Sequence, residues 1–356
     1  MSFGGHSLNL RTRRASRCKN GGMPGHKPIA ILIAAIVLAT DPSSGRTEAL
    51  RITARPVALN ARDRTVRTVG RLEYRGGLVL RARHRRFGGL SALHVSADGR
   101  RLLALSDVGR WVSARLSYDR AGRLIGLDRG RIGRLMRPGG GRTRWRQRDA
   151  ETIAALSGGR FLVGFEGTPR IWIYPASRVP FASAPRRVRV PRGLRFAARN
   201  AGLEALTVLH DGRLFALAED LEAPQPHGAM AHAAWVRSRR AWAALAYDRV
   251  GLYRPTGAAT LPRGTRHAGS VVVLERGVSL FTGFRARLML VRAKAIRPGA
   301  VIRPRHLATL ASPLTVDNFE GIATRRGPKG ETLVYLVSDD NFRKSQRTLL
   351  MMFVLR

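Results

Sequence analysis

The 356-residue sequence is poor in three residue types, and each shortage narrows the chemistry that the protein can carry out. It holds one cysteine, Cys18, which precedes an apolar N-terminal run, so a chain cleaved after that run would have none. Disulfides, thiolate metal sites and a thiol nucleophile are then excluded. Only five of the 64 basic residues are lysines, and the acids number only 23. Acids that recur at fixed positions are therefore informative.

The formal net charge of +41 comes almost entirely from arginine, which is spread along the whole chain. No helix-turn-helix, zinc-finger or aromatic-plus-basic RNA motif accompanies it. We therefore expect no specific nucleic-acid binding, but attraction to anionic envelope surfaces. The sequence also has no G-x-S-x-G elbow and no phosphate-binding P-loop, so a serine hydrolase of the α/β type and a nucleotide-binding site are unsupported.

An uncharged run of eleven residues, 29–39, marks the N-terminal part. As a helix it would span about 16 Å, too short for a hydrocarbon core of ~30 Å. Basic residues before it and small polar ones after it are typical of a secretory signal. We expect a signal peptide with an upstream basic segment over 1–49, a folded domain over 50–356 and a periplasmic or secreted location. An uncleaved membrane anchor is the alternative.

Four segments of the remaining chain align with one another: 88–107, 149–166, 202–219 and 319–339. Each reads as an apolar strand, a glycine-containing turn such as Asp98-Gly99, a second apolar strand and then an acid, which predicts a β-hairpin. The spacing implies a further unit near 262–285. There, residues 269–281 supply a strand, a turn and a strand, although the acid is missing.

The repeat length of 50–60 residues fits a propeller blade of four strands. The sequence predicts an all-β protein, a β-propeller with six four-stranded blades. The alanine-rich segment His227 to Tyr247 is interpreted as a helical insertion. A β-sandwich or a solenoid remains an alternative.

Acids occupy two positions of this repeat. At the start of the first strand stand Glu151, Glu204 and Glu320, with Ser91 in the first unit, and after the second strand stand Asp107, Glu166, Glu219 and Asp339. A hairpin brings these two positions together, so a closed propeller should gather the acids at one mouth of its channel. Crowded carboxylates need a cation, and oxygen-only ligands suit Ca²⁺. Arginine is the alternative neutralising group.

A second acid- and amide-rich pattern lies near the C-terminus, in 317–322 and 338–342. It adds Asn318, Asp340 and Asn341 to the candidates for the channel mouth, and Asn200 precedes Glu204 in a similar run. An asparagine beside a glutamate offers a neutral ligand next to a charged one, or forms a turn.

These residues give the sequence a resemblance to the phytase-like family, described as having esterase-like activity of phytase. The resemblance rests on Gly89-Leu90-Ser91, Ser106-Asp107, the run from Asn200 to Glu204, 317–321 and 338–342, and it covers about 85–356. It implies an exported bacterial β-propeller that hydrolyses phosphate or other esters with the help of calcium. The missing acid at Ser91 departs from the repeat.

Two functions follow from these features. As a hydrolase of small anionic or ester substrates, the protein would bind a metal through Glu151, Glu204, Glu320, Asp339 and Asp107. Glu204, Glu320 and Asp339 would then be the catalytic candidates. As a non-catalytic propeller, it would use the same channel mouth to capture a ligand or a metal ion.

Overall fold

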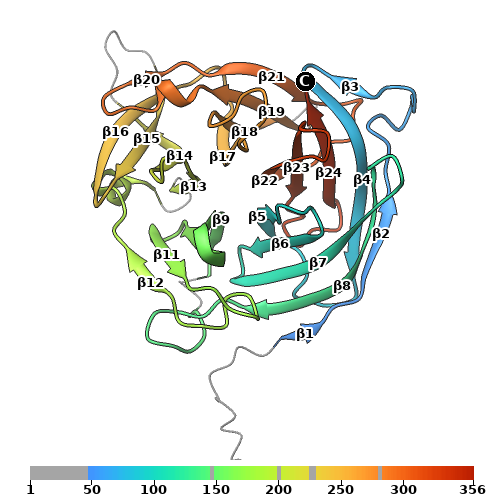
Figure 1. The fold of residues 1–356 in the computed structure, drawn as a ribbon, viewed down its shortest axis with the longest axis horizontal. Coiled ribbons are helices and arrows are strands. Elements are labelled where there is room, and N and C mark those ends of the chain that lie inside the picture. The colour runs from blue at the N-terminus through green and yellow to red at the C-terminus, as the bar shows by residue number, and fades with distance from the viewer. Residues whose placement is uncertain (1–46, 145–147, 199–201, 224–229, 280–282) are drawn as a thin grey trace, which may run out of the picture. The chain divides into compact units, whose positions relative to one another are not determined.

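The computed structural model describes residues 47–144, 148–198, 202–223, 230–279 and 283–356, all of which lie in one compact unit. They form five sheets arranged around a central axis (Figure 1), and all strand pairs are antiparallel except β16 and β20 of the third sheet. The first sheet has the spatial order β5 (Leu90–Val95), β6 (Arg101–Ser106), β7 (Arg110–Tyr118), β8 (Leu124–Arg134) and β1 (Glu48–Ala49). The second has the order β9 (Ala150–Leu156), β10 (Arg160–Phe165), β11 (Arg170–Tyr174) and β12 (Arg186–Val188).

The other three sheets repeat this plan. The third has the order β13 (Leu203–Val208), β14 (Leu214–Glu222), β15 (Ala231–Ser238), β16 (Ala241–Asp248) and β20 (Val301–Ile302). The fourth has the order β17 (Arg254–Thr260), β18 (Val271–Ser279), β19 (Gly283–Val291) and β21 (Arg305–Leu310). The fifth has the order β22 (Phe319–Arg326), β23 (Thr332–Ser338), β24 (Thr348–Leu355), β4 (Leu72–Ala82) and β2 (Ile52–Pro56), and β3 (Thr68–Val69) pairs with β4. Short 3-10 helices are η2 (Ser157–Gly159), η3 (Arg192–Phe196) and η5 (Ala293–Ala295).

The innermost strands form a closed ring. They contact one another in the order β5, β9, β13, β17, β22 and back to β5. Threonine side chains join neighbouring members of this ring: Thr256 Oγ1 donates to the Phe319 carbonyl at 3.2 Å, and Thr324 Oγ1 donates to the Thr260 carbonyl at 2.8 Å. Each sheet is thus one blade of a five-bladed β-propeller, and the predicted all-β propeller is confirmed.

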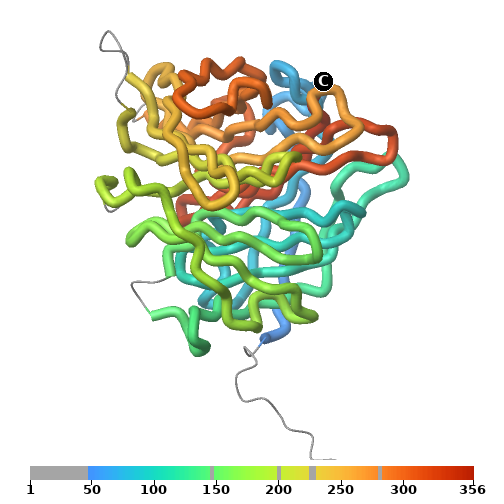
Figure 2. The backbone as a smooth tube through the Cα atoms, turned by 60° about the vertical axis from the view of Figure 1, so that its left-hand side comes forward, coloured from blue at the N-terminus to red at the C-terminus, as the bar shows by residue number. Residues whose placement is uncertain are grey.

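The ring is closed by two distant parts of the chain. In the fifth blade, β24 at the C-terminal end pairs along its length with β4 near the N-terminal end. Figure 2 shows this strand, in blue, beside the red C-terminal strands. Leu78 on β4 and Leu350 on β24 form one register pair, and neither is exposed to solvent. Burial of this seam stabilises the closed ring, because apolar area removed from water contributes about 25 cal/mol per Å².

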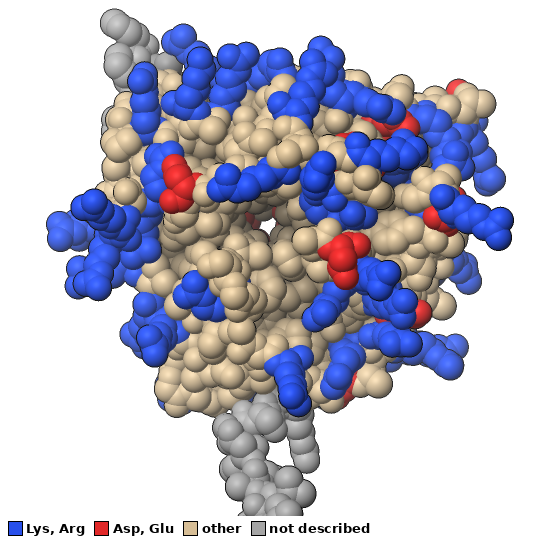
Figure 3. All heavy atoms as spheres, viewed as in Figure 1, with Lys and Arg blue, Asp and Glu red and all other residues tan. Residues whose placement is uncertain are grey.

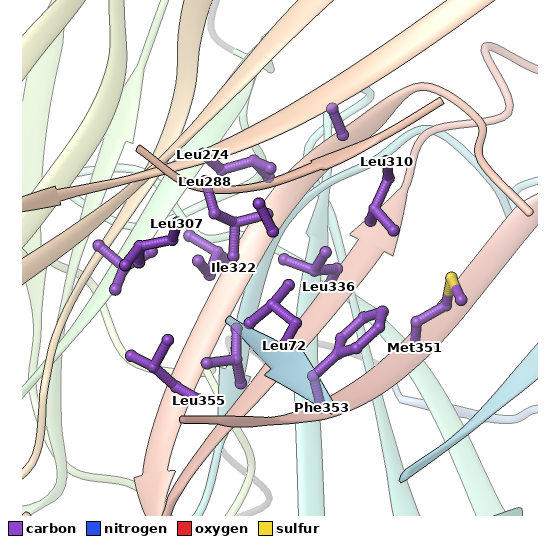
Figure 4. Close-up of a cluster of buried hydrophobic side chains, with 14 of the residues drawn as sticks. Leu72, Leu274, Leu288, Leu307, Leu310, Ile322, Leu336, Met351, Phe353 and Leu355 are labelled. Carbon is purple, nitrogen blue, oxygen red and sulfur yellow. The ribbon is translucent and has the colours of Figure 1, made fainter. Parts of the chain in front are cut away.

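Apolar side chains fill the space between adjacent blades. The largest cluster lies between the fourth and fifth blades and includes Leu274, Leu288, Ile322, Leu336 and Phe353 (Figure 4). Both faces of the inner and middle strands are covered, and every residue of β24 is buried. This explains why the strands read as continuous apolar runs rather than as alternating patterns.

The four aligned hairpins are confirmed as the two inner strands of the first, second, third and fifth blades. Their turn glycines, Gly99, Gly158, Gly212 and Gly330, all have φ between 71° and 82°. This left-handed backbone is the conformation that led us to expect glycine at these positions.

Three sequence-based expectations about the fold were wrong. The propeller has five blades and not six, because 52–82 supplies outer strands to the fifth blade instead of a blade of its own. The described part of the alanine-rich segment is a pair of strands, β15 and β16, whose small side chains pack within the third blade. The turn expected within 269–281 does not occur at 275–277, because Val271–Ser279 is one continuous strand.

The predicted boundary at residue 50 lies inside the first sheet. Glu48 and Ala49 form β1, which pairs with Ile132 and Arg131 on β8. The predicted signal peptide lies mostly outside the described residues, and it stays a prediction. Within the described residues, no helix is long and apolar enough to cross a membrane.

Candidate functional site

The same irregularity occurs at the start of every innermost strand. In β9, Ala150 pairs with Phe165 and Thr152 pairs with Gly164, which leaves Glu151 without a register partner on β10. Such a bulge re-aims one side chain without breaking the rest of the ladder. The equivalent residues in blade order are Ser91, Glu151, Glu204, Thr256 and Glu320. The first acid position of the repeat is therefore a bulge position in all five blades.

The second acid position is fixed by a recurrent backbone hydrogen bond. The N–H groups of Asp107, Glu166, Glu219 and Asp339 donate to the carbonyls that immediately precede the inner strands, at 2.9–3.0 Å. The fourth blade departs from this pattern: its equivalent residue is Arg276, since Glu275 pairs with Pro255 at the start of β17. The two positions of each hairpin lie side by side, as predicted.

Among the described residues, carboxylates of the second and third blades form two groups that are compact enough to hold a metal ion. Oxygen atoms of Asp149, Glu151 and Glu166 lie within 4.8 Å of one another, and so do those of Glu166, Glu204 and Glu219. Glu166 belongs to both groups and links them. We call these five residues the acidic cluster. All of them except Asp149 are buried.

Burial in the acidic cluster favours the protonated form of its members. Removal from water, together with the neighbouring carboxylates, raises the pKa of Glu151 and of Glu204 well above the ordinary value. Burial also raises the pKa of Glu166, although hydrogen bonds from Glu204 and from the Gly202 N–H oppose the rise. The hydrogen bond between the side chains of Glu204 and Glu166 raises the pKa of Glu204 and lowers that of Glu166. Crowded, buried carboxylates favour their protonated forms unless a cation neutralises them.

Arg276 is the positive charge beside this cluster. Its Nη2 lies 2.7 Å from Glu219 Oε1, and its Nη1 lies 2.5 Å from Glu320 Oε1. Nη1 also donates to Asn318 Oδ1 at 2.9 Å, and Asn318 Nδ2 in turn donates to Glu320 Oε1 at 2.7 Å. Burial lowers the pKa of Arg276, but Glu320 and Glu219 raise it further, so the group is held in its charged form. Arginine, which the sequence analysis gave as the alternative to a metal ion for neutralising the acids, is therefore present at this side of the ring.

Asp107, Asp339 and Glu320 complete the ring of acids. Burial and the nearby Asp339 raise the pKa of Asp107 to about 7. Burial is also the main reason that the pKa of Asp339 rises to about 6 and that of Glu320 to about 8. These three carboxyl groups can accept or release a proton near neutral pH.

The other C-terminal candidates hold the loops in place. Asp317 accepts hydrogen bonds from the backbone and side chain of Arg347 at 3.2 and 3.1 Å. Asp340 accepts from the Gly89 N–H and from Thr348 Oγ1 at 3.0 and 2.8 Å. Asn341 is exposed, with a φ of 47° that suits a turn. Asn200 lies outside the described residues.

Two members of the site were missed at the level of sequence. Asp149 lies immediately before an inner strand, which is the position that Asn318 has in the fifth blade, and this equivalence was a usable signal. Arg276 could not be recognised because Glu275-Arg276-Gly277 reads as a turn.

The donor set of the acidic cluster fits a divalent cation with oxygen ligands. It consists of carboxylates alone, drawn from two blades, and the protons that its members retain are the ones that a metal ion displaces. Glu320 is less available, because Arg276 and Asn318 already occupy one of its oxygen atoms.

The central channel has two hollows that differ in volume and in the side chains that line them. Near Ser91, Glu151 and Glu320 it narrows to a cavity of about 10 Å³. A second hollow of about 170 Å³ is lined by apolar and threonine side chains, such as Ile153, Thr207 and Thr324. Figure 3 shows a small opening at the centre of one face, with Lys and Arg spread over the surrounding surface. The acids of the ring therefore lie inside a molecule whose surface carries many Lys and Arg side chains.

The fold and this ring define the class of protein: a five-bladed β-propeller with carboxylates where its inner strands begin. The family model for "Phytase-like: Esterase-like activity of phytase" matches residues 85–342. The chain therefore belongs to the phytase-like family. None of the curated proteins matches its sequence.

Solved structures with a similar chain path are distant in sequence. A luciferin-regenerating enzyme has 12% identity and a TM-score of 0.38, covering 75% of this chain and 92% of its own. Virginiamycin B lyase from Staphylococcus aureus has 8% identity and a TM-score of 0.39, covering 86% and 100%. A catalytically inactive variant of that lyase, with quinupristin, has 9% identity, a TM-score of 0.40 and the same coverage. At these identities and TM-scores, the similarities do not bear on activity.

Proposed function

We propose that the acidic cluster binds a divalent cation, Ca²⁺ by its ligand chemistry, and that the protein hydrolyses phosphate or other esters at this channel mouth. The observation that carries the proposal is the pair of carboxylate triads joined through Glu166. Residues of the second and third blades would hold the ion, and Asp149 joins the ligands expected from sequence. The family description supports ester hydrolysis as the reaction class.

When bound, the ion would polarise a phosphoryl or acyl oxygen and activate a water molecule. Side chains of the protein itself would donate and accept the protons. Asp107, with a pKa of about 7, and Glu320, with a pKa of about 8, retain or lose a proton in the range that suits general acid–base catalysis. Arg276 would pair with Glu219 and fix the orientation of Glu320.

Phosphatase and esterase assays of the purified protein, with Ca²⁺ and with EDTA, test this proposal. We expect hydrolysis that requires Ca²⁺ and falls at least about tenfold in Glu204→Gln, since even partners outside the first shell of a metal contribute 10–100-fold. Glu222→Gln is the matched control, because Glu222 lies on the next strand with a side chain that is 65% exposed. Activity that survives EDTA and Glu204→Gln unchanged would overturn the proposal.

One observation favours the second candidate, a non-catalytic propeller that binds a metal ion or another ligand. The ring is incomplete: Ser91 and Thr256 stand where three blades have glutamate, and Arg276 replaces one acid. Calcium binding without turnover of any phosphate or carboxylate ester would assign the protein to this function.

Export is part of the proposal and rests on the apolar run at 29–39. N-terminal sequencing of the protein from the producing cell tests it. We expect a mature chain that begins after residue 39 and keeps β1. A chain that retains residues 29–39 would support the uncleaved anchor.

A further inference from the structure

Among the described residues, five arginines and no acid line a pocket of about 360 Å³ beside the first blade. Arg110 and Arg134 come from β7 and β8, and Arg85 and Arg86 come from the connection between β4 and β5. Arg148 lies just before β9, and Val108, Gly109, Thr143 and Phe342 complete the lining. The volume is within the lower range of small-molecule sites.

The two strand arginines are a like-charge pair. Arg110 and Arg134 are directly opposite each other in the register of β7 and β8, an arrangement that is destabilising for like charges. Arg110 is also buried, with 6% of its surface exposed. Burial and the neighbouring Arg134 and Arg86 lower the pKa of Arg110 to about 10. The fold thus holds cations together at a cost in stability.

No carboxylate forms an ion pair with these arginines within the described residues. Of the ion pairs there, none involves the five arginines of the pocket, and their guanidinium groups make no hydrogen bond to the described chain. Glu48 raises the pKa of Arg110 and of Arg134, but its side chain is 50% exposed and contacts His84 Nε2 at 3.1 Å. Cations that are crowded together in a pocket attract an anion that supplies the counter-charge.

The pocket is separated from the acid ring by Phe342. A Cβ atom on Gly89 would meet Asp107 Oδ1 at 2.2 Å and Phe342 Cε2 at 2.7 Å, so the carboxylate and the ring both flank this glycine. Phe342 adopts a φ of 53° and lines the pocket. The arginines are therefore close to the acid ring but form a distinct site.

We propose that this pocket binds a soluble anion of the phosphate class, held by Arg110, Arg134 and Arg86. Guanidinium groups match phosphate oxygens in bidentate geometry, and the anion would turn the repulsion between Arg110 and Arg134 into attraction. The site requires neither a bound metal ion nor catalysis, so it stands independently of the proposed hydrolysis.

A second basic hollow, lined by Arg266, Arg292, Lys294 and Arg305, provides the matched control. Its cations are all exposed, so water already solvates them. Removing two charges there changes the overall field as much as removing two charges from the arginine pocket.

The test is calorimetric titration of the full-length protein with pyrophosphate, and with inorganic phosphate, in EDTA. We expect saturable binding that weakens by about tenfold or more in Arg110→Met/Arg134→Met, since hydrogen bonds to charged groups contribute the most. Arg292→Met/Arg305→Met should stay within about twofold of the parent, as expected for screened surface charge. Pyrophosphate should also raise the melting temperature of the parent and of this control.

Equal losses in the two double variants, or no saturable binding by the parent, would overturn the proposal. The Arg110→Met/Arg134→Met protein should melt no lower than the parent in the absence of anion, because a like-charge pair is removed. If it does not fold, Arg86→Met serves in its place, with the same expected loss of binding. Weakening in Arg86→Met no greater than in Arg292→Met would then contradict the assignment.

Discussion

Arg276 on β18 lies 2.5 Å from Glu320 on β22 and occupies the position at which the other four blades have an acid. One guanidinium thus reaches two blades, since it also contacts Glu219 on β14. The ring consequently has two sides. Toward Glu320 a fixed guanidinium contacts the carboxyl groups, and around Glu166 burial and crowding raise the pKa values of the carboxyl groups.

Arg276→Met should destabilise the metal-free protein and strengthen its binding of Ca²⁺. Loss of the cation leaves Glu219 and Glu320 unpaired, and we expect a cost of about 2 kcal/mol, below the 3–5 kcal/mol of a fully buried pair. The discount reflects the 24% of the Arg276 side chain that is exposed. Urea unfolding in EDTA and calorimetric titration with Ca²⁺ measure the two effects.

Arg254→Met is the control for this change. Arg254 pairs with Asp220 at 2.7 Å in the same blade, but the two side chains are 44% and 30% exposed. Its loss should cost about 0–1 kcal/mol and leave Ca²⁺ affinity unchanged. Equal effects of Arg254→Met and Arg276→Met would show that the position of Arg276 in the ring is unimportant.

The metal-free protein should lose stability as the pH rises from 7 to 8.5. Glu320, with a pKa of about 8, keeps its proton to a higher pH in the folded state than in the unfolded chain, and the raised pKa values of Glu151 and Glu204 act in the same direction. The folded state binds more protons, so the free energy of unfolding falls by up to about 1.4 kcal/mol per pH unit for each such carboxyl. Urea titrations in EDTA at several pH values measure the slope.

The histidines determine the lower limit of the pH range in which this loss of stability can be measured. Burial lowers the pKa of His94 and of His232 to about 4, so their contribution to stability grows with pH until the unfolded histidines are neutral. Above pH 7 the contribution of the histidines to the free energy of unfolding is constant. Only the titration of the acids then changes the stability. Saturating Ca²⁺ should flatten the slope, as should Glu204→Gln in part. A metal-free stability that is constant or rises from pH 7 to 8.5 would contradict the pKa shifts.

Gly133→Ala should destabilise the first blade. A Cβ atom at Gly133 on β8 would lie 2.3 Å from Cζ2 of Trp111, the fully buried indole on the paired strand. Overpacking of this kind costs about 1–3 kcal/mol. Gly126→Ala on the same strand is the control, because the nearest atom to its Cβ is Ser117 Cβ at 4.0 Å. Thermal unfolding of the two variants should separate them, and equal melting temperatures would contradict the packing.

Local signals in the sequence were sufficient to predict the hairpins. Asp98-Gly99 and Asp211-Gly212 determine a turn between two apolar strands, and such a turn depends on neighbours in the chain. The number of blades depends on pairing between β4 and β24, which join residues about 270 positions apart. No local pattern in the sequence indicates that these two strands pair. The strands at 231–248 could not be predicted for a similar reason. Packing in the sheet overrides the helix propensity of alanine, and that packing depends on distant residues.

The acid positions were predictable for the same reason as the hairpins, since both belong to the repeat. Glu151, Glu204 and Glu320 share a bulge whose register the sequence already aligned. The fourth blade broke the alignment because Thr256 and Arg276 have different chemistry from their equivalents, although they occupy the same backbone positions. Which acids share an ion depends on blade-to-blade distances, which only the closed ring determines.

Titration of the metal-free parent and of Glu166→Gln with Ca²⁺ in a calorimeter tests the metal site most directly, because Glu166 belongs to both carboxylate triads. We expect saturable binding by the parent and an affinity lower by at least about tenfold in Glu166→Gln. The exposed Glu222→Gln should bind as the parent does. A parent protein that takes up no Ca²⁺, or a Glu166→Gln protein that binds it equally well, would contradict the metal site.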